Sequence, residues 1–198
     1  MSKLRTINIP GHAYFVTTKV KNGTDVFVDH LYCNIIINNL KYYLKTRYFD
    51  LGGFVVMPNH VHFMIRPYGE YSISEILRDF KKHTSKQIIQ RLKQDKKINR
   101  SLFYSSRGGR IQNPAQGSYC GIRNPASALW AQTLLDQFYV NTRKQEFQVW
   151  QANNWIKNIY SQEFFNQKVQ YIHRNPVRAG YVKTPEEFPY SSACYDIS

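Results

Sequence analysis

Long apolar runs and cysteine pairs are both missing from this chain of 198 residues. No apolar run is long enough to cross a bilayer, and the first residues, MSKLRTINIP, do not have the pattern of a signal peptide. We therefore expect a cytoplasmic protein with no membrane partner. Cys33, Cys120 and Cys194 are far apart and form no CxxC pair, so neither a zinc knuckle nor a disulfide framework is supported. We expect free thiols that are buried or incidental.

Acidic residues are also few. The chain has 13 Asp and Glu against 27 Lys and Arg, which gives a formal charge of +14 and a pI of about 9.7. A hydrophobic fraction of 42% and an aromatic fraction of 15% are typical of a globular protein and exclude general disorder. A basic, Tyr-rich domain suits a polyanion, because aromatic faces stack unpaired bases while cations hold phosphates. Nucleic acid is the expected partner, and a basic protein without such a partner is the alternative.

Hydrophobic periodicity predicts an α+β fold. A helix over 29–48 has Asp29 as a plausible N-cap, and a helix over 72–93 opens with Ser72 and Glu75 in a capping-box spacing. The expected elements are, in order, strand 12–20, helix 29–48, strand 50–58, strand 60–68, helix 72–93 and, as the missing strand, 147–160. This order is typical of a ferredoxin-like, or RRM-like, antiparallel sheet.

The periodic pattern breaks after the second helix. Residues 95–125 are polar, contain Gly and Pro, and hold a near-repeat, GRIQNPA at 109–115 and GIRNPA at 121–126. Two copies do not indicate a solenoid, so we interpret this segment as an inserted loop. A short helix capped by Asn124 follows, with Trp130, Leu134 and Phe138 on one stripe. We expect deletion of residues 100–122 to leave the fold intact.

A last strong helix is predicted over 161–180, with Ser161 as its cap. Its expected inward-facing residues are Phe164, Phe165, Val169 and Ile172. Proline disfavours helical geometry in the residue before it, so we expect the helix to end at Asn175-Pro176.

The stretch MPNHVH carries two histidines one residue apart. Side chains at i and i+2 of a strand point the same way, so His60 and His62 offer two imidazoles to one spot. Imidazole binds Mn, Zn, Fe and similar ions, but two ordinary surface or core histidines are the commoner explanation of an HxH pattern.

Tyr171 and Asn175 are four residues apart and share a face of the last helix. If that helix packs against the histidine strand, it adds an amide oxygen as a metal ligand and places a nucleophilic hydroxyl beside it. Spacing alone favours simpler roles, with Tyr171 in the core and Asn175 as a residue of the helix C-terminus.

Five stretches, GGFVVMPNHVHFMI, DFKKHTSKQI, VWQ, QYIHRNPVRAGYV and PYSSA, occur in an order that resembles the REP-associated tyrosine transposases. These are single-tyrosine HUH transposases with an IS200-like domain. The resemblance covers most of residues 10–94 and 147–194. Two features depart from many relatives: the long segment between TSK and WQ, and ANNWIKNIY in place of an acidic-His stretch after WQ.

The resemblance implies a single domain over 1–198 with an inserted loop and helix at about 95–146. It implies helices on one face of the sheet and an extra C-terminal catalytic helix. By the same resemblance, His60, His62 and Asn175 bind Mg²⁺ or Mn²⁺, and Tyr171 is the nucleophile. The implied activity is nicking and rejoining of single-stranded DNA near hairpins through a 5′-phosphotyrosine, by a monomer or homodimer.

The basic residues of the segment 78–97 are the predicted DNA contacts, against the alternative of a solvated helix face. They are Arg78, Lys81, Lys82, Lys86, Arg91, Lys93, Lys96 and Lys97. Two other functions stay open: a domesticated hairpin DNA- or RNA-binding protein without catalysis, and a zinc-dependent hydrolase. The second lacks a Glu or Asp beside the histidines to act as base.

Overall fold

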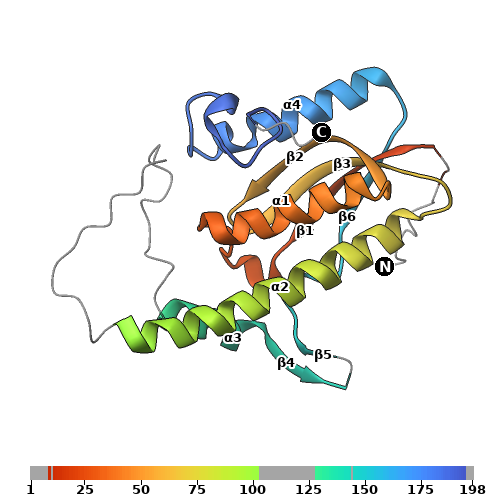
Figure 1. The fold of residues 1–198 in the computed structure, drawn as a ribbon. Helices are drawn as coiled ribbons and strands as arrows, with labels where there is room; N and C mark the ends of the chain where they lie inside the picture. The colour runs from red at the N-terminus through yellow and green to blue at the C-terminus, as the bar shows by residue number, and fades with distance from the viewer. Residues whose placement is uncertain (1–8, 10, 103–127, 144, 195–198) are drawn as a thin grey trace.

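The computed structural model describes residues 9, 11–102, 128–143 and 145–194, with side chains omitted for 98–102. Its centre is a four-stranded antiparallel sheet with the strand order β2-β3-β1-β6 (Figure 1). The elements of the sheet and its crossing helices are β1 Ala13–Lys19, α1 His30–Lys45, β2 Phe49–Met57, β3 His60–Pro67, α2 Ile73–Leu102 and β6 Trp155–Ile159. This βαββαβ order confirms the predicted α+β, ferredoxin-like class.

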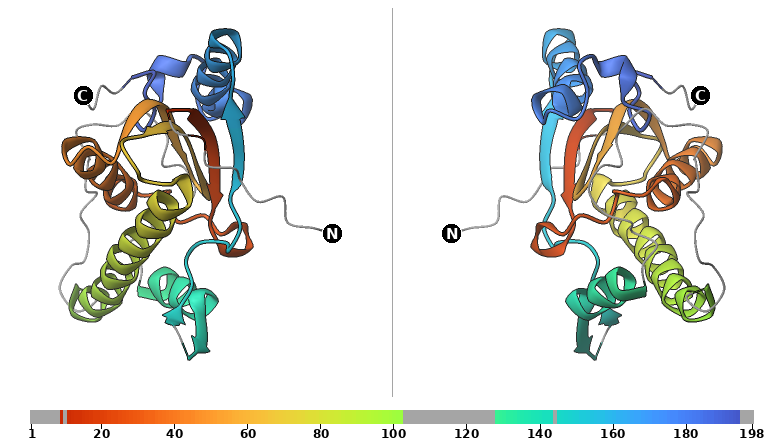
Figure 2. Two further views of the ribbon diagram at one scale, coloured as in Figure 1. Left: turned by 90° about the vertical axis from the view of Figure 1, so that its right-hand side faces the viewer. Right: turned by 90° about the vertical axis from the view of Figure 1, so that its left-hand side faces the viewer.

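The two faces of the sheet carry separate cores, because alternate residues of a strand point to opposite sides. On β1, Tyr14 and Val16 belong to the larger core beneath α1 and α2. Phe15 faces the other way and packs in a smaller core with Ile172 of α4, Gln162–Arg178. Figure 2 shows α4 and α1 on opposite sides of the sheet. The predicted extra C-terminal helix therefore covers the face that the two crossing helices leave open.

Three of the predicted helix starts, at Asp29, Ser72 and Ser161, are confirmed by their capping hydrogen bonds. Asp29 accepts from Leu31 N at 2.8 Å. The Ser72 hydroxyl accepts from Glu75 N at 3.2 Å, and the Glu75 carboxylate accepts from Ser72 N at 3.0 Å. Ser161 accepts from Phe164 N at 3.2 Å. Local side-chain chemistry thus sets where three of the four α-helices in the described part of the chain begin.

The segment predicted as an insertion contains more regular structure than expected. Residues 95–102, predicted as loop, extend α2. Beyond them come α3 Ala128–Phe138 and a small hairpin of β4 Tyr139–Thr142 and β5 Gln145–Phe147. The stripe of Trp130, Leu134 and Phe138 does pack inward, since Leu134 and Phe138 are buried and Trp130 meets Tyr32 edge-on at 5.4 Å. The near-repeat, Asn124, Cys120 and most of 100–122 lie outside the described residues.

The predicted strand 147–160 is wrong for its first half. Trp155–Ile159 pairs with β1 as a regular strand, whereas Trp150 forms an isolated bridge to Val20. Val149 and Trp150 are buried, and the Trp150 indole nitrogen donates to the Thr84 hydroxyl of α2 at 2.9 Å. The apolar side chains before β6 therefore pack against α2, while the backbone there adds an isolated bridge to the sheet and no regular strand.

The predicted end of the last helix is also wrong. Pro176 lies inside α4, which continues to Arg178. The stop is at Gly180, whose φ of +75° suits a residue without a Cβ. Gly180 N donates to Val177 O at 3.0 Å and Tyr181 N to Pro176 O at 2.9 Å, the paired bonds of a Schellman motif. Burial of Pro176 and this downstream stop outweigh the local preference against helix before proline.

Cys33 is buried, and its thiol donates to the Phe27 carbonyl oxygen at 3.4 Å, whereas Cys194 is exposed. In the part of the chain that the structure describes, no helix has the length and apolarity needed to span a membrane.

Candidate active site

The two histidines of β3 share the sheet face that α4 covers. Their ring centroids are 4.7 Å apart and the ring planes make an angle of 79°. His62 is 5% exposed, whereas His60 at the start of the strand is half-buried. The period-two spacing therefore brings both imidazoles to one place, as predicted.

Each histidine is held through its Nδ1. His62 Nδ1 is 2.8 Å from the Thr17 hydroxyl on the neighbouring strand β1. His60 Nδ1 is 2.7 Å from Asn59 Oδ1, and the Asn59 amide nitrogen donates to Asp25 at 2.9 Å. Because an amide oxygen only accepts, His60 carries its proton on Nδ1 and leaves the Nε2 lone pair free. Hydrogen-bonded Nδ1 atoms of this kind orient metal-binding histidines.

Burial keeps both imidazoles neutral. It lowers the pKa of His62 to about 3, with further lowering from His60, Lys19 and Lys168. It lowers the pKa of His60 to about 4, with help from Lys19 and opposition from Asp25. Neutral imidazole is the form that binds a divalent cation, so the pair fits a metal without first losing protons.

Tyr171 on α4 reaches the same place from the opposite side. Its ring lies 5.4 Å from the His62 ring at 75° and 5.8 Å from the Phe15 ring at 79°. Phe15 in turn stacks on His62 at 5.5 Å and 24°. The neighbour of Tyr171 in sequence, Ile172, is fully buried and anchors α4 on the sheet. The phenol and the histidine pair therefore form one cluster.

Two cations border the phenol. Lys168 Nζ lies 5.5 Å from the centroid of the Tyr171 ring, and the Arg178 guanidinium carbon lies 5.7 Å from it. Burial and the nearby Lys157 lower the pKa of Lys168. Positive groups around a phenol attract an approaching phosphate and stabilise the negative charge that develops on that phosphate.

Asn175 follows Tyr171 by one turn of α4 and is half-buried. Across the described residues, the Asn175 side chain makes no hydrogen bond, and no group of three His, Cys, Asp or Glu could hold a metal. The assignment of Asn175 as the third metal ligand stays a prediction.

Asn59 and Asp25 were not among the predicted site residues. The available signal was the Pro58-Asn59 connection immediately before His60. An amide next to a ligand histidine is a good candidate for holding its Nδ1, but Asp25 lies in a separate turn and is joined only by the fold.

Arg78, Arg91 and Lys81 are among the predicted DNA-contacting cations that are engaged within the chain. Arg78 pairs with Asp79 at 2.9 Å and Arg91 with Asp95 at 2.9 Å. Lys81 donates to the carbonyl of Gln151 at 2.7 Å, and burial lowers its pKa to about 8. Exposed pairs such as Arg78–Asp79 exchange partners at little free-energy cost, whereas Lys81 is partly buried and hydrogen-bonded to the loop before β6.

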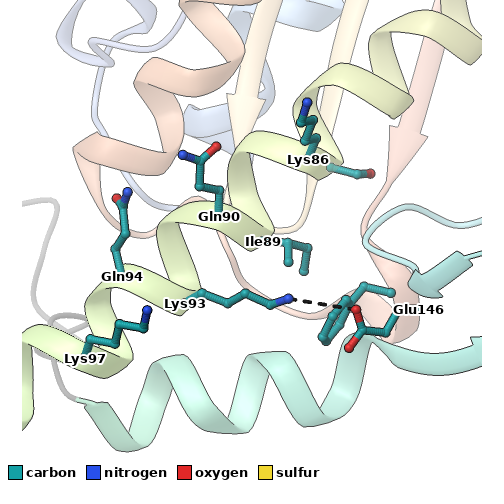
Figure 3. Close-up of a pocket in the computed structure, with 9 residues that line it drawn as sticks. Lys86, Ile89, Gln90, Lys93, Gln94, Lys97 and Glu146 are labelled. Atoms are coloured by element: carbon teal, nitrogen blue, oxygen red, sulfur yellow. Dashed lines mark ion pairs between the residues drawn. The ribbon is translucent and has the colours of Figure 1, made fainter.

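Other predicted cations are gathered on one groove. Lys86, Lys93 and Lys97 line a space of about 540 Å³ between α2 and β5 (Figure 3). Lys93 Nζ is 3.9 Å from Glu146 and 4.7 Å from the centroid of the Phe147 ring. Lys96 lines an adjoining space with Tyr139, and Lys82 is exposed on the same helix. Their contact with DNA stays a prediction.

A family model described as "Transposase IS200 like" matches residues 9–108. That range holds both histidines and all the cations of α2 named above, and it ends before α4. No curated protein matches the chain.

One solved structure, of a REP-associated tyrosine transposase bound to a REP hairpin, is similar along the whole chain. It is 21% identical, the match covers 100% of this chain and 90% of that one, and the TM-score is 0.57. At this identity the likeness shows the fold.

Proposed function

The chain belongs to the family of IS200-like transposases, and from this membership we propose that it is a metal-dependent endonuclease and strand transferase for single-stranded DNA. The observation that carries the proposal is the cluster of Tyr171 with His62 and His60. A phenol lies 5.4 Å, ring to ring, from an imidazole whose Nδ1 is already bonded. This arrangement offers a nucleophile for a phosphate and two nitrogen ligands for a metal ion beside that phosphate.

His60 and His62, with Asn175 as the proposed third ligand, would hold Mg²⁺ or Mn²⁺ through the free Nε2 atoms. Imidazole is a better ligand for Mn²⁺ than for Mg²⁺, whereas the cell supplies more Mg²⁺. When bound, the ion supplies Lewis-acid polarisation of a non-bridging phosphate oxygen. The chain itself keeps the two imidazoles neutral, oriented and away from bulk water.

In the proposed reaction, the Tyr171 oxygen attacks phosphorus as its proton leaves to solvent or a neighbouring base. The new bond joins the tyrosine oxygen to phosphorus, and the bond from phosphorus to the 3′ oxygen breaks. The departing oxygen takes a proton and becomes a free 3′-OH, while the 5′ side stays on the enzyme as a phosphotyrosine. Attack by another 3′-OH reverses these steps and joins strands without ATP. Lys168 and Arg178, which lie beside the Tyr171 ring, would stabilise the charge on the phosphate.

Recognition of a hairpin forms the second part of the proposal. The similar solved structure holds a REP hairpin. We assign the phosphates of such a hairpin to the lysine groove of α2, lined by Lys86, Lys93 and Lys97. Phosphate contacts fix the position of a duplex without reading its sequence, so base-edge contacts elsewhere would select the hairpin.

The test uses hairpins taken from the repeats of the source genome, with single-stranded flanks and a label at either end. With Mn²⁺ or Mg²⁺ we expect the 3′-labelled piece to stay covalently on the protein in a denaturing gel and the 5′-labelled piece to be released. Excess EDTA should prevent formation of both products, and a fully duplex control should stay uncut. Tight hairpin binding with no covalent label under any metal condition would contradict the enzymatic function and identify a binding protein.

A further inference from the structure

We propose that Trp155, on the outer strand of the sheet, stacks an unpaired base of the DNA strand beside Tyr171. This inference deepens the proposed function, because it assigns a nucleotide subsite to the same site. Trp155 opens β6 and is 48% exposed, although indole is among the side chains that gain most from burial. An exposed indole next to a reaction centre calls for a ligand with a flat apolar face.

The sheet register links Trp155 directly to the histidines. Thr17 of β1 pairs with His62 of β3 on one side and with Trp155 of β6 on the other. The three side chains therefore form a row across the sheet, on the face that α4 covers. Thr17 also holds His62 Nδ1 at 2.8 Å. A ligand on the indole thus lies one strand away from the residue that orients His62.

Phe15 joins the indole to the phenol. Its ring meets Trp155 edge-on at 5.5 Å and 84°, and meets Tyr171 edge-on at 5.8 Å and 79°. Trp155 and Tyr171 therefore belong to one aromatic cluster, joined by the buried Phe15 ring. A strand whose phosphate reaches Tyr171 has its neighbouring base within reach of Trp155, because the base and its phosphate belong to the same nucleotide or the next one.

Two lysines border this aromatic cluster. Lys157 Nζ is 5.0 Å from the centroid of the Trp155 ring. Lys168 Nζ lies among four aromatic rings, at 5.2 Å from Phe15 and 6.0 Å from Trp155. In the described part of the chain, no carboxylate pairs with either lysine. Uncompensated cations beside an exposed indole match a ligand that is flat and anionic.

An unpaired nucleotide has this chemistry, since it offers a free base face and a phosphate. A base pair inside a duplex does not, because both faces of each base are already stacked. The inferred occupant is therefore single-stranded DNA. Trp155 would contact the strand that is cut, and the lysine groove of α2 would contact the hairpin.

Binding measurements test the inference without relying on cleavage. Three fluorescent ligands are needed: a short oligothymidylate, an abasic strand of equal length and a duplex. The proteins are the full chain, Trp155→Ala, Trp155→Phe and Tyr42→Ala. Tyr42 is a matched control, because it is 54% exposed but lies on α1, away from this face.

We expect Trp155→Ala to weaken oligothymidylate binding roughly 10-fold, the effect of removing one stacked base. Binding of the abasic strand and the duplex should not change, Trp155→Phe should keep most of the affinity, and Tyr42→Ala should bind normally. Unchanged duplex binding also shows that the variant is folded. Equal losses for the abasic strand, or no loss for oligothymidylate, would overturn the inference.

Intrinsic fluorescence gives a second readout. Trp150 is buried and Trp130 packs on Tyr32, so Trp155 is the indole that a strand reaches. Oligothymidylate should quench the emission, and Trp155→Phe should abolish the quenching while keeping most of the affinity. Quenching that survives in Trp155→Phe would count against stacking. Stacking in a protein that forms no covalent adduct would support the subsite and contradict only the proposed chemistry.

Discussion

The ring of Tyr171 lies edge-on to the imidazole of His62, with centroids 5.4 Å apart and planes at 75°. The two residues come from elements that are distant in sequence, α4 and β3, and they meet because α4 packs on the open face of the sheet. His62 is fixed from behind by Thr17, and Tyr171 is fixed by the buried Ile172 next to it. The phenol and the imidazole are therefore preorganised, which is what an in-line attack on a held phosphate requires.

The first prediction concerns acid stability of the metal-free protein. The pKa of His62 is near 6.5 in the unfolded chain and about 3 in the folded one, because burial disfavours the charged form. Below about pH 6.5 the unfolded chain binds a proton that the folded chain does not, so the free energy of unfolding falls as pH falls. Between about pH 6.5 and pH 5 the loss should be about 2 kcal/mol from this residue. Urea unfolding of wild type and His62→Gln at several pH values measures this loss. If the free energy of unfolding changes equally with pH in both proteins, His62 does not contribute.

The second prediction concerns the metal itself. Because both histidines are neutral near pH 7, Mn²⁺ should bind with almost no proton release and should raise the melting temperature. His60→Gln should reduce this shift strongly while keeping hairpin affinity, because phosphate contacts elsewhere carry it. His30→Gln is the matched control, since the His30 side chain is 56% exposed at the start of α1. Equal thermal shifts in His60→Gln and wild type would place the metal elsewhere.

The third prediction concerns how α4 rests on the sheet. A Cβ at Gly52 would lie 2.9 Å from two atoms of the Phe165 ring, closer than side chains tolerate. Gly52→Ala should push Phe165 away and lower the free energy of unfolding by about 1 kcal/mol. Since Phe165 and Tyr171 share α4, nicking should slow as well. Gly53→Ala is the control, because its nearest contact is Ser192 Oγ at 3.4 Å. If both variants unfold like wild type, close packing at Gly52 does not position the helix.

The fourth prediction concerns the lysine groove of α2. Replacing Lys93 and Lys97 with Gln should weaken hairpin binding and lower the slope of log K against log salt by about 1.8, because two phosphate contacts are lost. Lys45→Gln on the exposed end of α1 should leave the slope unchanged. Fluorescence anisotropy over a salt series gives both slopes. An unchanged slope in the double variant would remove this groove from the DNA path.

Local patterns predicted the parts of the fold that depend on neighbours in sequence. The HxH spacing, the Asp29 cap and the Ser72–Glu75 box are short-range features, and each is present. The end of α4 was missed because a long-range fact, burial of Pro176, and the stop at Gly180 outweigh the local effect of proline.

The site was partly predictable for the same reason. A run of basic residues shows that α2 is cationic but does not show how the helix is turned. The orientation of α2 decides what each cation contacts. Lys81 bonds Gln151 and Arg91 pairs with Asp95, while Lys86 lines the open groove. The support of His60 by Asn59 and Asp25 joins two separate turns, and only the folded chain reveals it.

The most direct test of the central claim identifies the residue that carries the DNA. Tyr160 and Tyr181 are suitable controls, since they flank α4 and are 75% and 42% exposed, more accessible than the half-buried Tyr171. Tyr171→Phe removes only the hydroxyl and should keep folding, metal binding and hairpin binding.

After reaction with a hairpin substrate and Mn²⁺, the adduct is trapped, digested and located by mass spectrometry. We expect the 5′-phosphate on the peptide containing Tyr171, no adduct in Tyr171→Phe, and normal adducts in Tyr160→Phe and Tyr181→Phe. DNA attached to another tyrosine, or an undiminished adduct in Tyr171→Phe, would contradict the account.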